Sequence, residues 1–363
     1  MEPASCGTRT GVRAMSARVV SRTDRLPLGT ALRLYWIPLA IVAALLAATA
    51  ILAPDFFQPR NLLNVARQAS IVGVISIGMT FVILTGGIDL SVGAILALCG
   101  VATAVMVIAG LPLALVIPAA IALGVAVGLL NGMGVALLKI QPFIMTLAMM
   151  VLARGAALRV TNGGPKQFLS SNPVLDFLGS GGLGPIPGPV VIFALVAIAG
   201  VIVLRYFAFG LHIYAVGGSL EAARLSGVHT SRTRIGAYAI SGACAGIAGL
   251  MSAARLSVGD PIAGNLVELD SITAVVIGGT SLMGGSGGAL GTIGGALLLA
   301  VLSNVMNLVG ISPFDQLIVK GFVIIGAVLL AARATTPRSG QRLSSGGAKP
   351  DAATPVPVQG VRN

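Results

Sequence analysis

The chain has 363 residues, of which 56% are hydrophobic and only 9% are charged, and its mean hydropathy is +0.97. Soluble domains carry about 25% charged residues, so this chain has too little charge to cover a water-soluble globule, which excludes a soluble enzyme, a disordered chain and a nucleic-acid binder. The net charge of +12 lies mainly at the chain ends and in short loops between apolar runs. Composition therefore predicts a membrane protein with many spans, oriented by its basic residues.

Ten apolar runs approach the roughly 20 residues that a helix needs to cross a bilayer. In chain order they are 36–53, 71–87, 93–110, 111–130, 143–159, 189–206, 235–254, 269–282, 288–309 and 316–332. The runs are continuously apolar rather than alternating, which favours helices over barrel strands. The predicted fold class is all-α, a polytopic helical membrane protein with about 10 transmembrane helices.

Ten spans place both chain ends on one side of the membrane. With that side cytoplasmic, 16 Lys and Arg face the cytoplasm, 11 of them in the two tails, and six face outside. The positive-inside rule therefore predicts an N-in, C-in topology. The domains are a basic cytoplasmic extension over 1–34, a transmembrane domain over 35–333 and a disordered cytoplasmic tail over 334–363. A secretory signal remains an alternative for the N-terminus.

The most informative segment reads T-G-G-I-D-L-S-V-G and runs from Thr85 to Gly93. Its glycine pair permits a sharp reversal or a broken helix at the membrane edge. Asp89 or Ser91 can cap the following helix. The segment is either a capped turn between spans or a part of the transport path.

A second block, over residues 278–285, has the same G-G-x-x-L-x-x-G skeleton as residues 86–93. Transporters often contain internal repeats, and chance matches are common in a glycine-rich chain, so both interpretations stay open. Neither block is a phosphate-binding loop, because no lysine follows a glycine anywhere in the chain. We predict no cofactor, no metal site and no catalytic residue.

The longest internal polar stretch, 209–234, contains a short helix with its own start and stop signals. Ser219 is a suitable N-cap, Glu221 lies in the first turn, Arg224 lies near the C-terminal end, and Gly227 is a stop. A helix of two turns is not stable alone in water. It therefore needs a docking surface, which is a partner protein, the parent chain or lipid headgroups.

Several motifs, in order along the chain, resemble one family. The pattern G-x-x-x-A-A-x-x-S-G in residues 218–227 resembles the coupling segment of ABC-importer permeases. The block over residues 85–93 resembles the hallmark of the branch that imports ribose, xylose, arabinose and related sugars. Further matching pieces are Asn131-Gly132, residues 142–147, Arg154-Gly155 and residues 275–285. The resemblance runs from about residue 36 to residue 332.

This resemblance implies a permease that performs no chemistry itself and lies in the bacterial inner membrane. The implied partners are cytoplasmic ATPase subunits that carry ATP and Mg²⁺, a sugar-binding protein outside and a second permease subunit. The implied ATPase-coupling residues are Gly218, Ser219, Glu221, Ala222, Ala223, Arg224, Ser226 and Gly227. The motif and path candidates are Thr85, Gly86, Gly87, Asp89, Ser91, Gly93, Asn131, Thr146, Gly278, Gly279 and Asn304, and further polar path candidates are Thr80, Thr273, Ser303 and Asn307.

Charged residues near the membrane separate the competing functions. Arg154 and Lys320 lie near span ends, and Glu268, Asp270 and Asp315 near the outer rim could pair with them or contact the binding protein. No acidic residue falls in the middle of a predicted span, which argues against an ion-coupled secondary carrier. Within the importer class the cargo could also be a polyol or inositol, a nucleoside, a furanone signal or a branched-chain amino acid. A passive channel is a further alternative.

Overall fold

The computed structural model describes residues 54–169 and 172–335, so the predicted span 36–53, the basic extension and nearly all of the tail lie outside the described residues. The elements are η1 (Pro54–Phe57), α2 (Pro59–Leu84), α3 (Val92–Ile108), α4 (Leu113–Ala136), α5 (Pro142–Thr161), β1 (Lys166–Gln167), α6 (Pro173–Gly179), β2 (Gly182–Leu183), β3 (Ile186–Pro187), α7 (Gly188–Tyr206), α8 (Ala208–Gly218), α9 (Leu220–Leu225), α10 (Thr230–Leu256), β4 (Val258–Gly259), α11 (Val267–Ile277), α12 (Ala289–Leu308) and α13 (Pro313–Thr335). The four short strands form two antiparallel pairs, β1 with β4 and β2 with β3.

Each of the nine predicted spans in the described ranges overlaps a helix. Six of these helices, α2, α4, α5, α7, α10 and α12, are long and apolar enough to cross a membrane. The prediction of a polytopic helical membrane protein is confirmed at this level. Proline at the first or second position starts α2, α5 and α7. There its missing amide costs no hydrogen bond.

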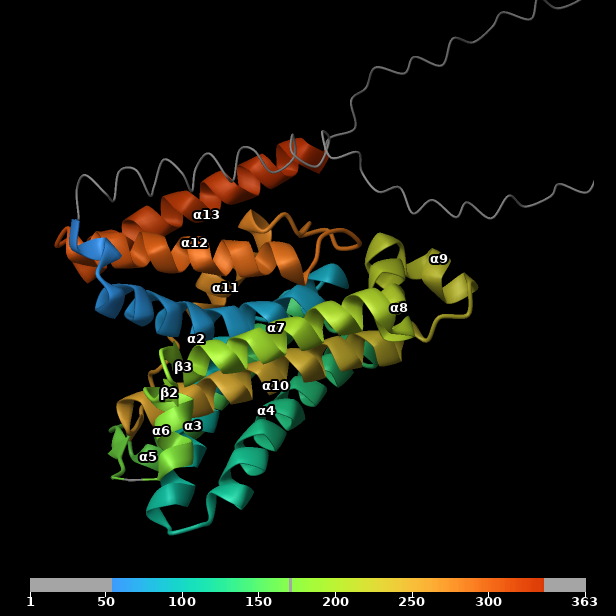
Figure 1. The fold of residues 1–363 in the computed structure, drawn as a ribbon. Coiled ribbons are helices and arrows are strands. Elements are labelled where there is room, and N and C mark those ends of the chain that lie inside the picture. Colours follow the sequence, from blue (N-terminus) through green and yellow to red (C-terminus); the bar gives the residue numbers. More distant parts are fainter. Residues whose placement is uncertain (1–53, 170–171, 336–363) are drawn as a thin grey trace, which may run out of the picture.

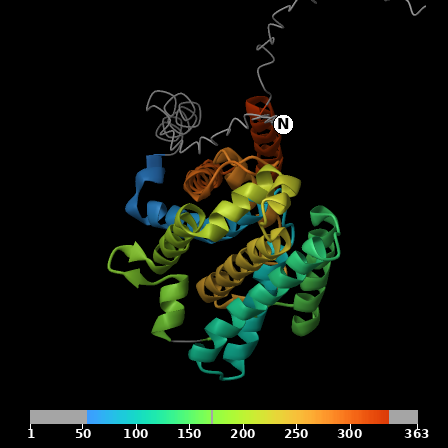
Figure 2. The same cartoon turned by 90° about the vertical axis from the view of Figure 1, so that its right-hand side faces the viewer.

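Helices α2 and α10 form the centre of the bundle (Figures 1 and 2). Helices α11 and α12 cover one side of α2, and α13 lies beyond them, while α3 and α4 pack on α10. In the most apolar stretch, 78% of the residues of α2 are buried, against 22% in α5. Helix α5 directs Val151 and Leu152 outwards, both more than 60% exposed within the chain. Such a surface fits contact with lipid or with another subunit.

Helices α4 and α10 approach each other closely through glycine. A methyl group on Gly242 would overlap the carbonyl oxygen of Gly124, and one on Gly128 would overlap that of Tyr238. Small residues let membrane helices bring their backbones together, because van der Waals packing rather than the hydrophobic effect drives their association. This contact holds the helix that follows the coupling loop.

The predicted span 269–282 is wrong as a full-length helix. Helix α11 has only 11 residues, about 16 Å, which is half of the roughly 30 Å hydrocarbon core. It ends at Gly278, and Gly279 follows in a left-handed conformation with φ of 85°. The glycine pair therefore stops the helix well before the end of the apolar run.

An extended segment precedes α11 and runs back along α3. An added Cβ on Gly259 would lie 2.9 Å from the Cα atom of Val101, and one on Gly264 would lie 2.7 Å from the carbonyl oxygen of Gly93. The segment thus runs along about two turns of α3, towards the first residue of α3, before α11 begins. Non-helical backbone at this depth is tolerated where protein covers it. The crossing is a broken helix of the kind that transporters use.

Candidate functional site

The predicted coupling helix exists as α9 and lies at one end of the bundle, after α8 (Figure 1). Ser219 is its N-cap, and its hydroxyl accepts a hydrogen bond of 3.2 Å from the amide of Ala222. Gly227 follows the helix with φ of 82°. Both predictions about start and stop are confirmed. Ala223 is the one buried residue of α9, whereas Leu225 is 80% exposed.

Three glycine segments meet beside α9 and form what we call the glycine junction, residues 84–86, 217–218 and 284–285. The amide of Gly285 donates a 3.0 Å hydrogen bond to the carbonyl oxygen of Leu84. Added Cβ atoms on Gly284 and Gly285 would each lie 2.8 Å from a backbone nitrogen, of Gly86 and Gly218 respectively. The junction therefore joins the two predicted glycine blocks to the segment just before α9.

The other glycine candidates have separate roles in packing. A Cβ on Gly87 would lie 2.7 Å from the hydroxyl of Tyr238, and one on Gly278 would lie 2.5 Å from the carbonyl oxygen of Gly291 on α12. Gly93 lies against the carboxylate of Glu268. Gly279, by contrast, has open space around it and is required only for its positive φ.

A buried polar cluster forms around Asp89, which is 0% exposed. Its Oδ1 accepts hydrogen bonds from the amide and hydroxyl of Ser91, at 3.0 and 2.6 Å, and its Oδ2 accepts one of 2.9 Å from the Ser241 hydroxyl. Asn131 donates to the Ser91 hydroxyl at 2.8 Å. The cluster thus links the start of α3 to α4 and α10. Ser91 occupies the N-cap position, yet its hydroxyl makes no capping bond because it is used by Asp89.

Asp89 lies in the interior of the bundle, although it falls between two predicted spans. Ser241, whose hydroxyl binds Asp89, lies next to Gly78, because an added Cβ on Gly78 would be 2.9 Å from the Cα atom of Ser241. Gly78 is nearly two turns before the end of α2, so Asp89 lies beside the middle of the bundle rather than beside the end of α2. The loop after α2 therefore folds back into the bundle instead of staying at the membrane edge. Of the two predicted alternatives, the structure shows the sharp reversal, and the loop lies further inside the bundle than predicted.

Two further candidates complete this region. Thr146 donates to the carbonyl oxygens of Pro142 at 2.9 Å and Ile88 at 3.3 Å, and Tyr238 donates to Ile88 at 3.4 Å. Thr85 donates to the carbonyl oxygen of Val82 at 2.8 Å. The structure thus brings Asp89, Ser91, Asn131 and Thr146 together. Sequence reasoning missed Ser241 and Tyr238, because nothing in the helical run of α10 marks them as partners of the distant loop.

Asn304 lies apart from this cluster and forms a reciprocal pair with Asn61. Each side-chain amide donates to the other's carbonyl oxygen at 2.9 Å, which joins α12 to α2. Thr80 and Thr292 form a similar link between the same two helices, with 2.8 Å between their hydroxyl oxygens.

The remaining polar path candidates also bond within the chain. Thr273 donates to the carbonyl oxygen of Leu269 at 2.6 Å, and Asn307 accepts from Gln316 at 2.8 Å. Ser303 is 8% exposed on α12. The Asn307 bond joins α12 to α13, whereas the Thr273 bond stays within α11.

One of the expected charge pairs forms, between α13 and α11. Lys320 on α13 binds Asp270 on α11, with 2.8 Å between the ammonium and a carboxylate oxygen. Arg154 instead donates to the carbonyl oxygens of Pro261 and Ala263, both at 2.8 Å. Arg154 therefore fastens the extended segment before α11 to α5.

Two predicted rim acids have other surroundings. Glu268 is only 8% exposed and lies against Gly93 at the first turn of α3, so its assignment to the outer rim is wrong. Glu268 lies there because the segment before α11 runs back along α3 to the first turn of α3. Asp315 is exposed and accepts a 2.7 Å hydrogen bond from Ser312 at the start of α13. Within the described ranges, no three His, Cys, Asp or Glu side chains gather as a metal site would require.

Comparison with known proteins identifies the family. Residues 61–329 match the family described as the branched-chain amino acid transport system permease component. The chain is 45% identical to the ribose import permease protein RbsC of Bacillus subtilis over 286 residues, 79% of this chain and 89% of that protein. It is 43% identical to RbsC of Escherichia coli K12, covering 80% and 92% of the two chains. It is 35% identical to the xylose transport system permease protein XylH of Escherichia coli K12, covering 83% and 91%.

No solved structure matches the chain. The resemblance indicated by the sequence motifs is confirmed by a family match that covers most of the chain and by these relatives. The chain therefore belongs to the branched-chain amino acid transport system permease family, as a membrane transport subunit of an ABC importer rather than an enzyme.

Proposed function

We propose that the chain is the permease subunit of an ABC importer that moves a simple sugar, a ribose-like pentose or a related monosaccharide, into the cytoplasm. The observation that carries this proposal is the 45% identity to a ribose import permease across 89% of that protein's length. Identity at that level over nearly the whole relative includes the coupling loop and both glycine blocks. The xylose relative supports the wider sugar class.

The proposed mechanism is ATP-driven alternation between two permease conformations. Cytoplasmic ATPase subunits bind α9, whose exposed Leu225 offers an apolar contact. A partner can shift a conformational equilibrium only by binding one state more tightly than the other. Movement of α9 reaches the two glycine loops through the glycine junction, because backbone lies directly on backbone there. ATP and Mg²⁺ belong to the ATPase, and this chain binds no cofactor.

We propose an N-in, C-in topology with about ten spans in a bacterial inner membrane. This topology places the α4–α5 loop, α9 and the loop after α11 on the cytoplasmic side. A second permease subunit and a sugar-binding protein on the outside complete the importer. Affinity for the sugar comes from the binding protein, so the path through the chain needs hydroxyl and amide groups without a tight site.

Uptake into vesicles tests this function. The chain is reconstituted with its cognate ATPase and binding protein, and uptake of labelled ribose, xylose, inositol, a nucleoside and leucine is measured with and without ATP. We expect ATP-dependent uptake of a pentose and none when the binding protein is omitted. Uptake that proceeds without ATP and collapses with an ion gradient would contradict the importer. ATP-dependent uptake of leucine alone would contradict the sugar class.

A further inference from the structure

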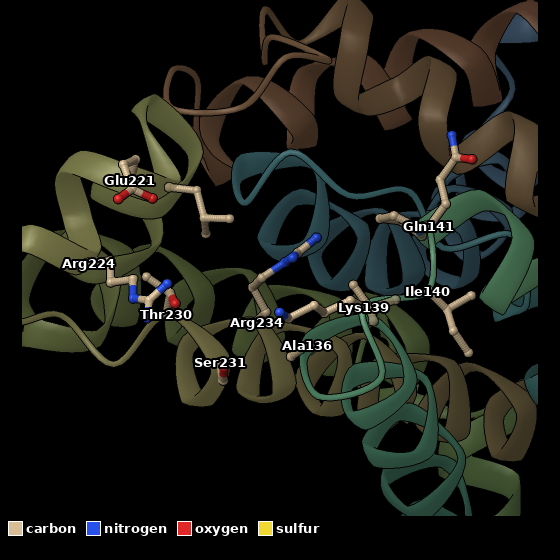
Figure 3. A pocket seen from close by; sticks show the side chains of 12 residues that line it. Ala136, Lys139, Ile140, Gln141, Glu221, Arg224, Thr230, Ser231 and Arg234 are labelled. Carbon is tan, nitrogen blue, oxygen red and sulfur yellow. The ribbon is translucent and has the colours of Figure 1, made fainter.

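A cavity of about 580 Å³ lies between the α4–α5 loop, α9 and the first turns of α10. Figure 3 shows Arg234 projecting into this space, with Lys139 beside it and the α9 side chains on the opposite wall. We call it the basic cavity. Its polar lining residues include Lys139, Gln141, Glu221, Arg224, Ser231 and Arg234.

The lining carries an excess of positive charge. Lys139, Arg224 and Arg234 come from three different elements, and Glu221 is the one carboxylate in the lining. Among residues 54–169 and 172–335, none of the three cations forms an ion pair with a carboxylate. The Nε atom of Arg234 is buried and finds no hydrogen-bond partner in the described part of the chain. A buried guanidinium donor without an acceptor is costly, and a carboxylate on the accessible side of the Arg234 guanidinium would offset part of that cost.

The backbone at Lys139 is a second, independent sign. Lys139 has φ of 56° just after the end of α4, where a glycine usually stands because a side chain is strained in that conformation. The conformation is held by backbone hydrogen bonds from Leu137 to Met133, 2.8 Å, and from Ile140 to Gly134, 3.1 Å. The chain is therefore less stable with lysine at this position than it would be with glycine. Strain of this kind is concentrated at functional sites.

We propose that the basic cavity receives an acidic side chain of the ATPase subunit, which bonds to Arg234 and Lys139 while α9 docks beside it. This inference rests on the proposed function. Part of the cavity wall is α9 itself, so a partner that binds α9 lies directly beside the cavity. The wall carries both signs of charge, with Glu221 near Arg224 (Figure 3). A protein surface can match such a mixed pattern, whereas a lipid phosphate would meet Glu221 with like charge.

The test measures the dissociation constant of the ATPase for the reconstituted permease in nanodiscs, at several salt concentrations. The variants are Lys139→Gln and Arg234→Gln, and the control is Arg232→Gln, an exposed arginine on the same turn of α10 that does not line the cavity. We expect each cavity variant to weaken binding about tenfold, as for a lost charge-assisted hydrogen bond, and to reduce its salt dependence. The control should change binding less than twofold.

The variant Lys139→Gly separates the effect of the lost charge on ATPase binding from any effect on the stability of the fold. Glycine relieves the backbone strain, so this variant should unfold at the same or a higher temperature than the parent while binding the ATPase about tenfold more weakly. Arg234→Glu should lose binding and regain it with one Asp or Glu to Lys change on the ATPase surface. Failure of every such change in a complete scan of ATPase surface acids would contradict an acidic partner side chain.

The outcomes distinguish this inference from the proposed function. If the unaltered permease does not bind the ATPase, the proposed function fails. If it binds and the cavity variants bind equally well with the same salt dependence, the cavity inference is overturned and the importer stands. If the variants weaken binding only in nanodiscs that contain anionic lipid, and not in phosphatidylcholine, the cavity holds a lipid headgroup and the inference is again overturned.

Discussion

The amide of Gly285 donates a hydrogen bond to the carbonyl oxygen of Leu84 across 3.0 Å, and this bond ties the loop after α11 to the end of α2. The two loops belong to the two G-G-x-x-L-x-x-G blocks, which lie almost 200 residues apart in the sequence. Gly217, at the end of α8, fills the remaining space beside Leu84. Because backbone packs directly on backbone here, we expect a shift of α9 to displace both loops.

Gly217→Ala should disrupt the glycine junction. Its added methyl group would overlap the carbonyl oxygen of Leu84 and could be accommodated only by a backbone shift. Overpacking of this kind costs about 1–3 kcal/mol. We expect a lower unfolding temperature in detergent and loss of ATP-coupled uptake.

Gly294→Ala, on α12 and outside the glycine junction, is the control, because no atom lies within 4 Å of its added Cβ and its φ is not in the left-handed region. It should keep the unfolding temperature and coupled uptake of the parent. Equal behaviour of the two variants, whether both active or both inactive, would contradict the steric account of the junction.

Asp89→Ala should destabilise the chain strongly. The substitution leaves the Ser91 amide and hydroxyl and the Ser241 hydroxyl without their acceptor, and each unsatisfied buried donor costs about 1–3 kcal/mol. Asp89→Asn keeps one acceptor oxygen and should lose less. The half-buried Asp260→Asn is the control, since within the described ranges only the amide of Ile262 bonds to its carboxylate. Differential scanning fluorimetry of the three variants ranks these losses.

The same Asp89→Asn variant also tests the ion-coupled alternative. A secondary carrier would use a buried carboxylate to bind and release a proton or Na⁺. In the importer, Asp89 holds three helices together, so a folded Asp89→Asn variant should keep ATP-dependent uptake. Abolished uptake with an unchanged unfolding temperature would favour ion coupling.

Removing either member of the Lys320 and Asp270 ion pair should loosen α13 from α11. Both side chains are roughly one-quarter exposed, at 24% and 21%, so a double-mutant cycle with Lys320→Met and Asp270→Asn should give a coupling energy of about 1 kcal/mol. Unfolding in detergent measures it. A coupling energy near zero would mean that solvent screens the pair and that packing alone holds α13.

The long apolar helices could be predicted from the sequence, whereas the extended segment before α11 could not. Hydropathy finds α2, α10 and α12 because lipid or apolar core surrounds each turn. It fails for the extended segment before α11, since Asp260 and Pro261 read as an outer loop although the chain descends there along α3. Protein rather than lipid covers that backbone, and no local pattern records which helix will cover it.

The candidate site shows the same limit. The block around Asp89 stands out locally, and its caps and reversal follow from glycine and serine chemistry. Its depth depends on Ser241, which lies 152 residues away and looks like any small residue in a membrane helix. Likewise, Ser219 and Gly227 could be identified as the start and stop of α9, whereas the contact of Gly217 with Leu84 depends on tertiary packing alone.

Asn304→Ala decides whether this residue lines the path or joins two helices. It was selected as a path candidate, yet its amide is occupied by Asn61 through two hydrogen bonds of 2.9 Å. If the pair is structural, Asn304→Ala and Asn61→Ala should each lower stability by about 1 kcal/mol, the scale of such bonds between membrane helices. The double variant should lose less than the sum of both, because the second change removes a bond that is already broken.

Initial uptake rates, measured over a range of concentrations of the sugar-loaded binding protein, should match the parent for both single variants. A tenfold loss of rate in Asn304→Ala with normal transport in Asn61→Ala would instead place Asn304 on the path, since only a residue that touches the cargo would act independently of its partner.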